Sequence, residues 1–221
     1  MQTVLSRHFI RICFQATILS LFLLLVRYIL IHDDFFWFLP WNLGLAWIPL
    51  GISSVMTKRS KKVSSVGRQG VLCGLWLLFY PNAAYIVTDL VHLKARPGVS
   101  SAYDFLLIAA FAITGLLLAY ISLAQLHQVV KRRWGKMAGW FFVGVVMAMT
   151  SFGIYLGRVL RWNSWDVFTH PAAVFSDIVY VLHALTQPLT MIVMLIFSAA
   201  LFLFYASLRW ASESHISTTV T

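Results

Sequence analysis

The sequence has little charge and almost no cysteine. Only 11% of its 221 residues are charged and 60% are hydrophobic, whereas soluble domains carry about 25% charged residues. So little charge is atypical of a soluble surface, and the composition favours an integral membrane protein. The two cysteines, Cys13 and Cys73, fall inside apolar segments. We interpret them as small buried side chains, which argues against a disulfide or half of a metal site.

Several sequence motifs of known enzymes and nucleotide-binding proteins are also absent. The chain has no nucleophile elbow, Walker loop, dinucleotide fingerprint or HExxH pair. In a soluble domain, a net charge of +10 would suggest binding to nucleic acid. Here, however, most Lys and Arg residues lie in two short loops between apolar segments. We therefore predict no nucleic-acid partner. No linker or repeat divides the sequence, so we expect a single membrane domain over residues 1–221.

Long apolar windows recur along the chain. A helix crosses the bilayer core of about 30 Å with about 20 residues, and windows of this length lie at residues 10–31, 36–56, 69–91, 104–126, 137–160 and 188–208. No small-residue cleavage pattern follows the first window, so we read it as a retained span. Residues 171–186 predict a short interfacial helix, and residues 211–221 predict a mobile polar tail. The expected fold is an all-α, polytopic membrane helical bundle with six transmembrane helices and an interfacial helix before the last span.

Positive charge predicts which face of the membrane is cytoplasmic. Twelve of the 17 Lys and Arg residues fall on the side of the two termini: Arg7, Arg11, Lys58, Arg59, Lys61, Lys62, Arg68, Lys131, Arg132, Arg133, Lys136 and Arg209. We therefore expect a plasma-membrane protein with cytoplasmic N- and C-termini. Six of the seven acidic residues fall toward the outer face: Asp33, Asp34, Asp89, Asp104, Asp166 and Asp177. A polar site should therefore face away from the cytosol.

Polar residues interrupt the third apolar window. Pro81 removes a backbone donor and frees the carbonyl four residues earlier, which predicts a kink next to Asn82. Asp89 lies about 28 Å from the cytoplasmic boundary, and Arg158 in the fifth window reaches about 30 Å, at a rise of about 1.5 Å per residue. An isolated charge in a membrane is costly, so we predict that Asp89 pairs with Arg158 or Arg161. In the alternative interpretation, this pair only fastens two helices together.

Two pairs of polar residues have a spacing that would suit a bound ion. Asp89 and His92 are three residues apart on one helical face and could ligate one divalent metal, although a histidine near an interface is more often simply hydrogen-bonded. Arg158 and Arg161 have the same spacing and suit a phosphate or carboxylate, or they extend to lipid headgroups beside neighbouring tryptophans. Both pairs of alternatives stay open. Apart from this candidate metal, we assign no cofactor.

Three motifs carry a family resemblance. The segments YPNAAYIVTDLVHL (Tyr80 to Leu93), Tyr103-Asp104 and GRVLRWNSWD (Gly157 to Asp166) resemble a bacterial family of predicted integral membrane proteins, domain-of-unknown-function family 1361. Ala84 stands where the family pattern has a second proline, which bears on how sharply the kink is set. The resemblance implies a multi-pass bacterial membrane protein and assigns no activity or cofactor.

Together these residues predict a polar site on the outer face that binds a polar ligand or a lipid headgroup. Its expected members are Asn82, Asp89, His92, Asp104, Arg158, Arg161, Asn163 and Asp166, with Pro81 as the structural kink. The alternative is a membrane-embedded enzyme that acts on an envelope lipid or glycan precursor, with Asp89 or His92 as acid, base or metal ligand. A small transporter is the least favoured function, because the cytoplasmic halves of the spans lack acids and no inverted repeat is visible. Membrane lipids are the only partners that the sequence predicts.

Overall fold

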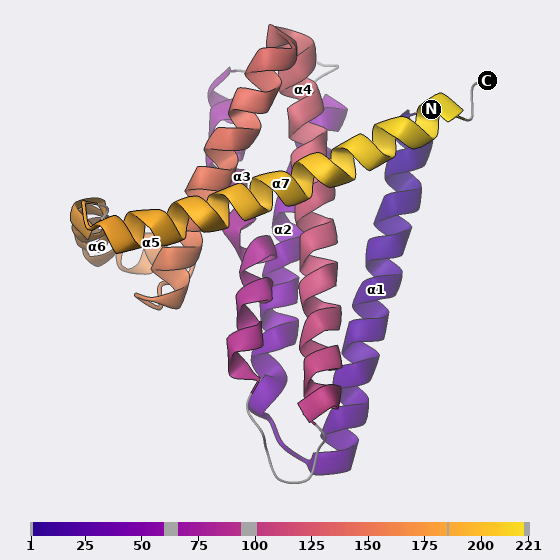
Figure 1. Ribbon diagram of the computed structural model, residues 1–221, viewed down its shortest axis with the longest axis vertical. Helices are drawn as coiled ribbons and strands as arrows, with labels where there is room; N and C mark the ends of the chain where they lie inside the picture. The colour runs from indigo at the N-terminus through magenta and orange to yellow at the C-terminus, as the bar shows by residue number, and fades with distance from the viewer. Residues whose placement is uncertain (1, 60–65, 94–100, 185, 219–221) are drawn as a thin grey trace. The chain divides into compact units, whose positions relative to one another are not determined.

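Helices are the only regular structure in the part of the chain that the structure describes. The computed structural model describes residues 2–59, 66–93, 101–184 and 186–218. The elements in chain order are α1 (Gln2–Ile31), η1 (Phe35–Trp37), α2 (Phe38–Arg59), α3 (Val66–Tyr85), η2 (Ile86–His92), α4 (Ser101–Arg158), α5 (Asp166–Thr169), α6 (Pro171–Ala184) and α7 (Pro188–Thr218) (Figure 1). The two η elements are short 3-10 helices. The predicted all-α class is confirmed.

Five described helical segments are long and apolar enough to cross a membrane: His8–Ile31, Phe35–Lys58, Gly67–Val91, Ser101–Arg158 and Pro188–Ser212. The predicted class of membrane helical bundle rests on these segments. The fourth segment is the 58-residue helix α4, which takes in the regions predicted as the fourth and fifth spans. Its backbone leaves the helical conformation at Gly135, where φ is 91° and ψ is 172°. The loop expected between these two spans is therefore a break at a single glycine.

Prolines stand at different places in these helices. Pro171 and Pro188 are the first residues of α6 and α7, where a missing N–H costs nothing because the first turn has no intrahelical acceptor. Pro81 lies inside α3, and the helix continues past it to Tyr85 before it tightens into the 3-10 helix η2. The α-helix therefore does not end at the predicted kink. At the other end of the chain, α7 continues past residue 208, where the last span was expected to end.

The chain divides into two compact units, Met1–Val129 and Val130–Thr221. In the first unit, α1, α2, α3 and the first part of α4 run side by side (Figure 1). The buried stripe of α2 consists of Leu39, Leu43, Ala46 and Leu50, whose spacing of three and four residues places them on one helical face. This face of α2 supplies part of the core of the unit.

Hydrogen bonds between polar side chains also join the helices of the first unit. Nε1 of Trp76 on α3 donates to Oγ of Ser122 on α4 at 2.8 Å, and this hydroxyl donates to Oγ of Ser53 on α2 at 3.1 Å. Ser53 in turn donates to Oε1 of Gln125 at 2.8 Å. Membrane helices commonly associate through such bonds, because lipid offers polar groups no alternative partner.

Helices α3 and α4 approach each other closely at Gly115. A Cβ atom on this glycine would lie 2.6 Å from the carbonyl oxygen of Ala83 and 3.0 Å from Cδ1 of Ile86. Only a residue without a side chain fits here, as is usual where membrane helices are in close contact. Gly115 thus sets the spacing between the end of α3 and α4.

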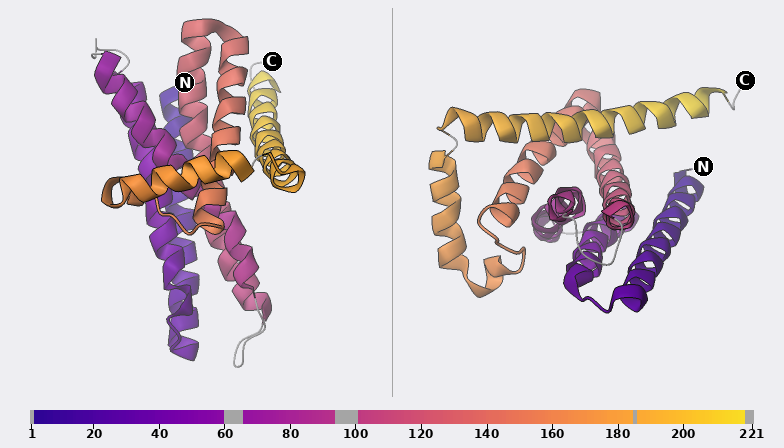
Figure 2. Two further views of the ribbon diagram at one scale, coloured as in Figure 1. Left: turned by 90° about the vertical axis from the view of Figure 1, so that its left-hand side faces the viewer. Right: turned by 60° about the horizontal axis from the view of Figure 1, so that its bottom comes forward.

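The second unit contains the remainder of α4 with α5, α6 and α7 (Figure 2). Oγ of Ser151 on α4 donates to the carbonyl oxygen of Met194 on α7 at 2.9 Å. The ring of Trp140 lies 5.8 Å from that of Phe202 and 6.1 Å from that of Tyr205, measured between centroids. These contacts attach α7 to the second segment of α4.

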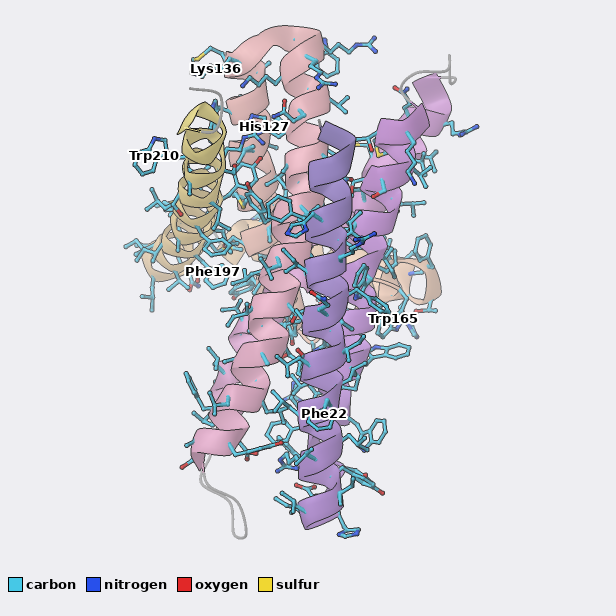
Figure 3. All side chains as sticks on the ribbon, turned by 90° about the vertical axis from the view of Figure 1, so that its right-hand side faces the viewer. Phe22, His127, Lys136, Trp165, Phe197 and Trp210 are labelled. Carbon is cyan, nitrogen blue, oxygen red and sulfur yellow. The ribbon has the colours of Figure 1, made fainter. Side chains whose placement is uncertain are left out.

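Large apolar side chains are exposed along several helices. Phe22 on α1 and Trp210 on α7 are exposed, and the Trp210 side chain points away from its helix (Figure 3). In α7, Leu189, Ile196 and Leu203 are also exposed. Contiguous apolar surface of this kind is typical of helices that face lipid.

Candidate functional site

A buried ion pair lies at the end of the first unit where α1 ends and α4 begins. Nε of Arg27 donates to Oδ1 of Asp104 at 2.8 Å, and the two side chains are only 1% and 3% exposed. Nη2 of Arg27 also approaches Oδ2 of Asp33 at 3.4 Å, and Asp33 is 39% exposed. One guanidinium thus lies between a buried carboxylate and a partly exposed one.

The turn after α1 places these groups. The helix ends at Ile31 and His32 adopts a positive φ of 55°, which reverses the chain. Oδ1 of Asp33 then accepts a hydrogen bond from the backbone N–H of Phe35 at 3.0 Å, a local bond that favours a turn. Oδ1 of Asp34 accepts from Nε1 of Trp37 at 2.9 Å. Both aspartates are therefore held by the turn that begins α2.

Aromatic rings surround the ion pair. Cζ of Arg27 lies 4.3 Å from the centroid of the buried Phe36 ring, within the range of a cation–π contact. The ring of Phe35 packs edge-to-face on that of Phe36 at 5.0 Å, and the ring of Tyr28 packs on that of Trp37 at 6.1 Å. We call Arg27, Asp33, Phe36 and Asp104 the Arg27 cluster.

One buried hydrogen-bond donor of the Arg27 cluster lacks an acceptor in the described part of the chain. Among the described residues, Nη1 of Arg27 is buried and has no hydrogen-bond partner. Its two N–H groups would normally be satisfied, since buried polar groups are nearly always hydrogen-bonded. An acceptor of the right kind, an oxygen of a ligand or of water, would complete the coordination of the guanidinium.

A second buried carboxylate belongs to the first unit. Asp89 on η2 is 1% exposed, and Nδ2 of Asn42 on α2 donates to its Oδ2 at 3.2 Å. Nearby in sequence, Oγ1 of Thr88 donates to the carbonyl oxygen of Tyr85 at 2.6 Å. Asp89 is thus held by an amide from another helix, at the point where the α-helix has become a 3-10 helix.

The predicted site residues of the second unit form a local turn. The backbone N–H of Asn163 donates to Oδ2 of Asp166 at 2.7 Å, and Nδ2 of Asn163 reaches the same oxygen at 3.2 Å. Nε1 of Trp162 donates to Oδ2 of Asp177 at 2.7 Å, which ties this turn to α6. Arg161 is exposed and has a positive φ of 61°. Asn163 and Asp166 therefore shape the turn, whatever else they do.

A comparison with known protein families matches most of the chain to a family model. The family model described as "Protein of unknown function (DUF1361)" matches residues 41–203. The chain belongs to this family. The matched region contains Asn42, Asp89 and Asp104 and begins after Arg27. No curated protein and no solved structure matches the chain.

Membership of the DUF1361 family confirms the resemblance inferred from sequence, and the structure shows where the predicted residues lie. Asp89 and Asp104 are both buried in the first unit. Nδ2 of Asn82 donates to the carbonyl oxygen of Phe79 at 3.1 Å, a bond within its own helix. The side chain of His92 lies outside the described part of the chain, so its pairing with Asp89 at a metal stays a prediction.

Arg158 belongs to the second unit and is half-buried. Its contact with Asp89 also stays a prediction, as does that of Arg161. Within the described residues, no group of three or more His, Cys, Asp or Glu side chains lies close enough together to hold a metal ion.

The sequence placed Asp33 toward the outer face, but it did not predict that Arg27, Asp33, Phe36 or Asn42 belongs to the site. A signal for the first of these was present in the sequence. Arg27 is a charged residue inside an apolar window, and Asp104 opens another window near the same predicted face. Because each charge is costly in lipid when alone, the two could have been expected to pair.

Proposed function

We propose that this protein is a multi-pass membrane protein that binds a polar ligand, such as a lipid headgroup, at the Arg27 cluster. The observation that carries the proposal is the buried Nη1 atom of Arg27, which has no hydrogen-bond partner within the described chain. A buried donor without a partner costs about 1–3 kcal/mol, and more when it is charged. A ligand oxygen that accepts from Nη1 would recover this free energy, so the cluster favours a bound state.

The aromatic residues near the Arg27 cluster support a ligand at headgroup depth. Tyr28 at the end of α1, Trp37 in η1 and Trp41 at the start of α2 are exposed. Trp and Tyr gather where the hydrocarbon core meets the headgroups, because their rings are amphipathic. A ligand that reaches Arg27 from this level would therefore be a headgroup or a polar molecule at the membrane surface.

Charge supports an orientation with the Arg27 cluster on the outer face. Lys58 lies at the end of α2 and Arg68 near the start of α3, which is the opposite end of the first unit from the Arg27 cluster (Figure 1). Positively charged loops favour the cytoplasm. In this orientation in the plasma membrane, both termini are cytoplasmic and the Arg27 cluster lies at the level of the outer leaflet.

The burial of Asp89 favours a second candidate function, a membrane-embedded enzyme acting on an envelope lipid or glycan precursor. A carboxyl group that is 1% exposed and held by the amide of Asn42 suits a general acid or base, because burial and fixed hydrogen bonds are how enzymes tune such groups. Turnover of an envelope lipid extract that Asp89→Asn abolishes, with ligand binding retained, would favour this candidate.

The binding proposal is tested by native mass spectrometry of protein extracted from host membranes in mild detergent. The variant Arg27→Gln with Asp104→Asn removes the guanidinium without leaving a buried carboxylate unpaired. Arg11→Gln is the matched control, because Arg11 is exposed on the same helix. We expect the wild-type protein and the control to retain bound ligand or lipid, and the double variant to lose about tenfold in occupancy, as expected for about 1.4 kcal/mol.

One result of this measurement would contradict the binding proposal. Equal retention in the wild-type protein and the double variant would show that the Arg27 cluster holds only the helices together. Circular dichroism of both proteins must show the same helical content, so that a change in retention reports on the site and not on unfolding.

A further inference from the structure

Helix α1 carries an exposed stripe of side chains on the side that does not pack into the first unit. The stripe consists of Gln15, Ile18, Phe22, Leu25 and Ile29, all of which are exposed. We call this set the α1 stripe. Its four apolar members are between 53% and 59% exposed. The buried face of the helix carries Cys13, Ser20, Leu24 and Arg27, which lie about half a turn around the helix from the stripe.

The spacing of the α1 stripe is that of a contact between two helices. Its members follow one another at intervals of three, four, three and four residues, which is a repeat of seven. Helices that pack side by side at a small crossing angle place residues of this repeat along their contact, and membrane helices commonly pack in this way. The stripe therefore offers a partner helix a nearly straight edge of about 21 Å.

Gln15 is the polar member of the α1 stripe. It is exposed and lies seven residues inside the apolar segment His8–Ile31. Its amide has two N–H donors and a carbonyl acceptor, whereas the hydrocarbon of the bilayer offers no hydrogen-bond partner. Lipid can cover the apolar residues of the stripe, but the amide favours a second helix with a polar group at the same depth.

We propose that the α1 stripe is the interface between two copies of this chain, with the two Gln15 side chains hydrogen-bonded across a twofold axis. Two copies inserted in the same direction present their α1 helices parallel to each other, so a twofold axis along the membrane normal brings each residue of the stripe to its counterpart. An amide is donor and acceptor at once and is complementary to its own copy. A single polar residue in a contact of this repeat also fixes its register and the number of helices.

The neighbouring residues set the limits of this interface. One turn before Gln15, the next position of the repeat is the exposed Arg11, whose charge would repel its counterpart, so the uncharged contact begins at Gln15. Arg27 lies on the buried face of α1. Pairing through the α1 stripe is therefore independent of a ligand at the Arg27 cluster.

The test measures self-association of the full-length protein in lipid bilayers, by energy transfer between donor-labelled and acceptor-labelled copies at a series of protein-to-lipid ratios. Gln15→Leu should weaken dimerisation about fivefold, which corresponds to about 1 kcal/mol. Leucine gains nothing in exchange, because lipid is as apolar as its side chain. Gln15→Asn keeps an amide at this position and should retain most of the association.

Two leucines give a matched comparison for the apolar part of the stripe. Leu25 belongs to the α1 stripe, whereas Leu30 is also exposed but lies outside it. We expect Leu25→Ala to weaken dimerisation and Leu30→Ala to leave it unchanged. Equal effects of the two substitutions would show that the repeat does not define the contact.

Other results would overturn the proposal. A protein that stays monomeric at every protein-to-lipid ratio has no such interface, and a dimer that Gln15→Leu leaves unchanged is held elsewhere. Cysteine cross-linking identifies the occupant of the stripe: Ile18→Cys, in a chain with Cys13→Ser and Cys73→Ser, should form a disulfide between two copies when membranes are oxidised. A cross-link from this cysteine to a different membrane protein, without one between copies, would assign the stripe to another partner.

Discussion

The close approach of α3 and α4 at Gly115 gives the sharpest prediction for stability. Replacing Gly115 by alanine would place a Cβ atom 2.6 Å from the backbone oxygen of Ala83, about 0.8 Å inside the 3.4 Å at which ordinary contact begins. A backbone oxygen cannot rotate away as a side chain can, so α3 must move from α4. Overpacking of this kind costs about 1–3 kcal/mol, while the gain in helix propensity is at most about 1 kcal/mol.

The assay is thermal unfolding in detergent, followed by circular dichroism, with Gly44→Ala as the matched control. Gly44 lies inside α2 of the same unit, and a Cβ atom there would meet nothing within 4 Å. We expect Gly115→Ala to lower the melting temperature by several degrees and Gly44→Ala to leave it unchanged or raise it. The same midpoint for both variants would refute the close packing of α3 on α4.

Three further predictions concern hydrogen bonds and charge. Asp104→Asn should destabilise the protein by about 3–5 kcal/mol, because it leaves the buried Arg27 without its main partner. In a double-mutant cycle, adding Arg27→Gln should restore most of that loss. Additive effects of the two substitutions would contradict the ion pair. Ser122→Ala should lower the free energy of unfolding by about 1 kcal/mol in a denaturant titration, since it removes the acceptor of the Trp76 indole N–H. An unchanged free energy of unfolding would show that this bond does not stabilise the protein. Trp162→Phe should speed hydrogen exchange in α6 without changing exchange in α2, because it removes the bond to Asp177; unchanged exchange in α6 would argue that other contacts hold it.

The elements of this fold were predictable because membrane crossing depends on length and hydropathy, and both can be counted in a sequence. The predicted windows at residues 10–31 and 36–56 fall within α1 and within η1 with α2. The break at Gly135 was harder to place, because a single glycine, which adopts a positive φ readily, is enough to interrupt a helix.

The candidate site was only partly predictable. Asp89 and Asp104 were expected in it, and both are buried. The partners that the structure gives them, Asn42 and Arg27, were not foreseen. Which side chains meet depends on the rotation of each helix about its axis and on its neighbours, and spacing along one helix carries no information about either. Asn163 was interpreted as a ligand group because the turn that it forms with Asp166 is not visible in a hydrophobicity pattern.

The most direct test of the Arg27 cluster as a binding site is an experimental structure of the full chain, determined in a lipid environment at a resolution that shows ordered ligands. The account predicts density from a non-protein group with an oxygen about 2.7–3.2 Å from Nη1 of Arg27. A lone water molecule at that position, or a protein carbonyl that satisfies Nη1 directly, would contradict it.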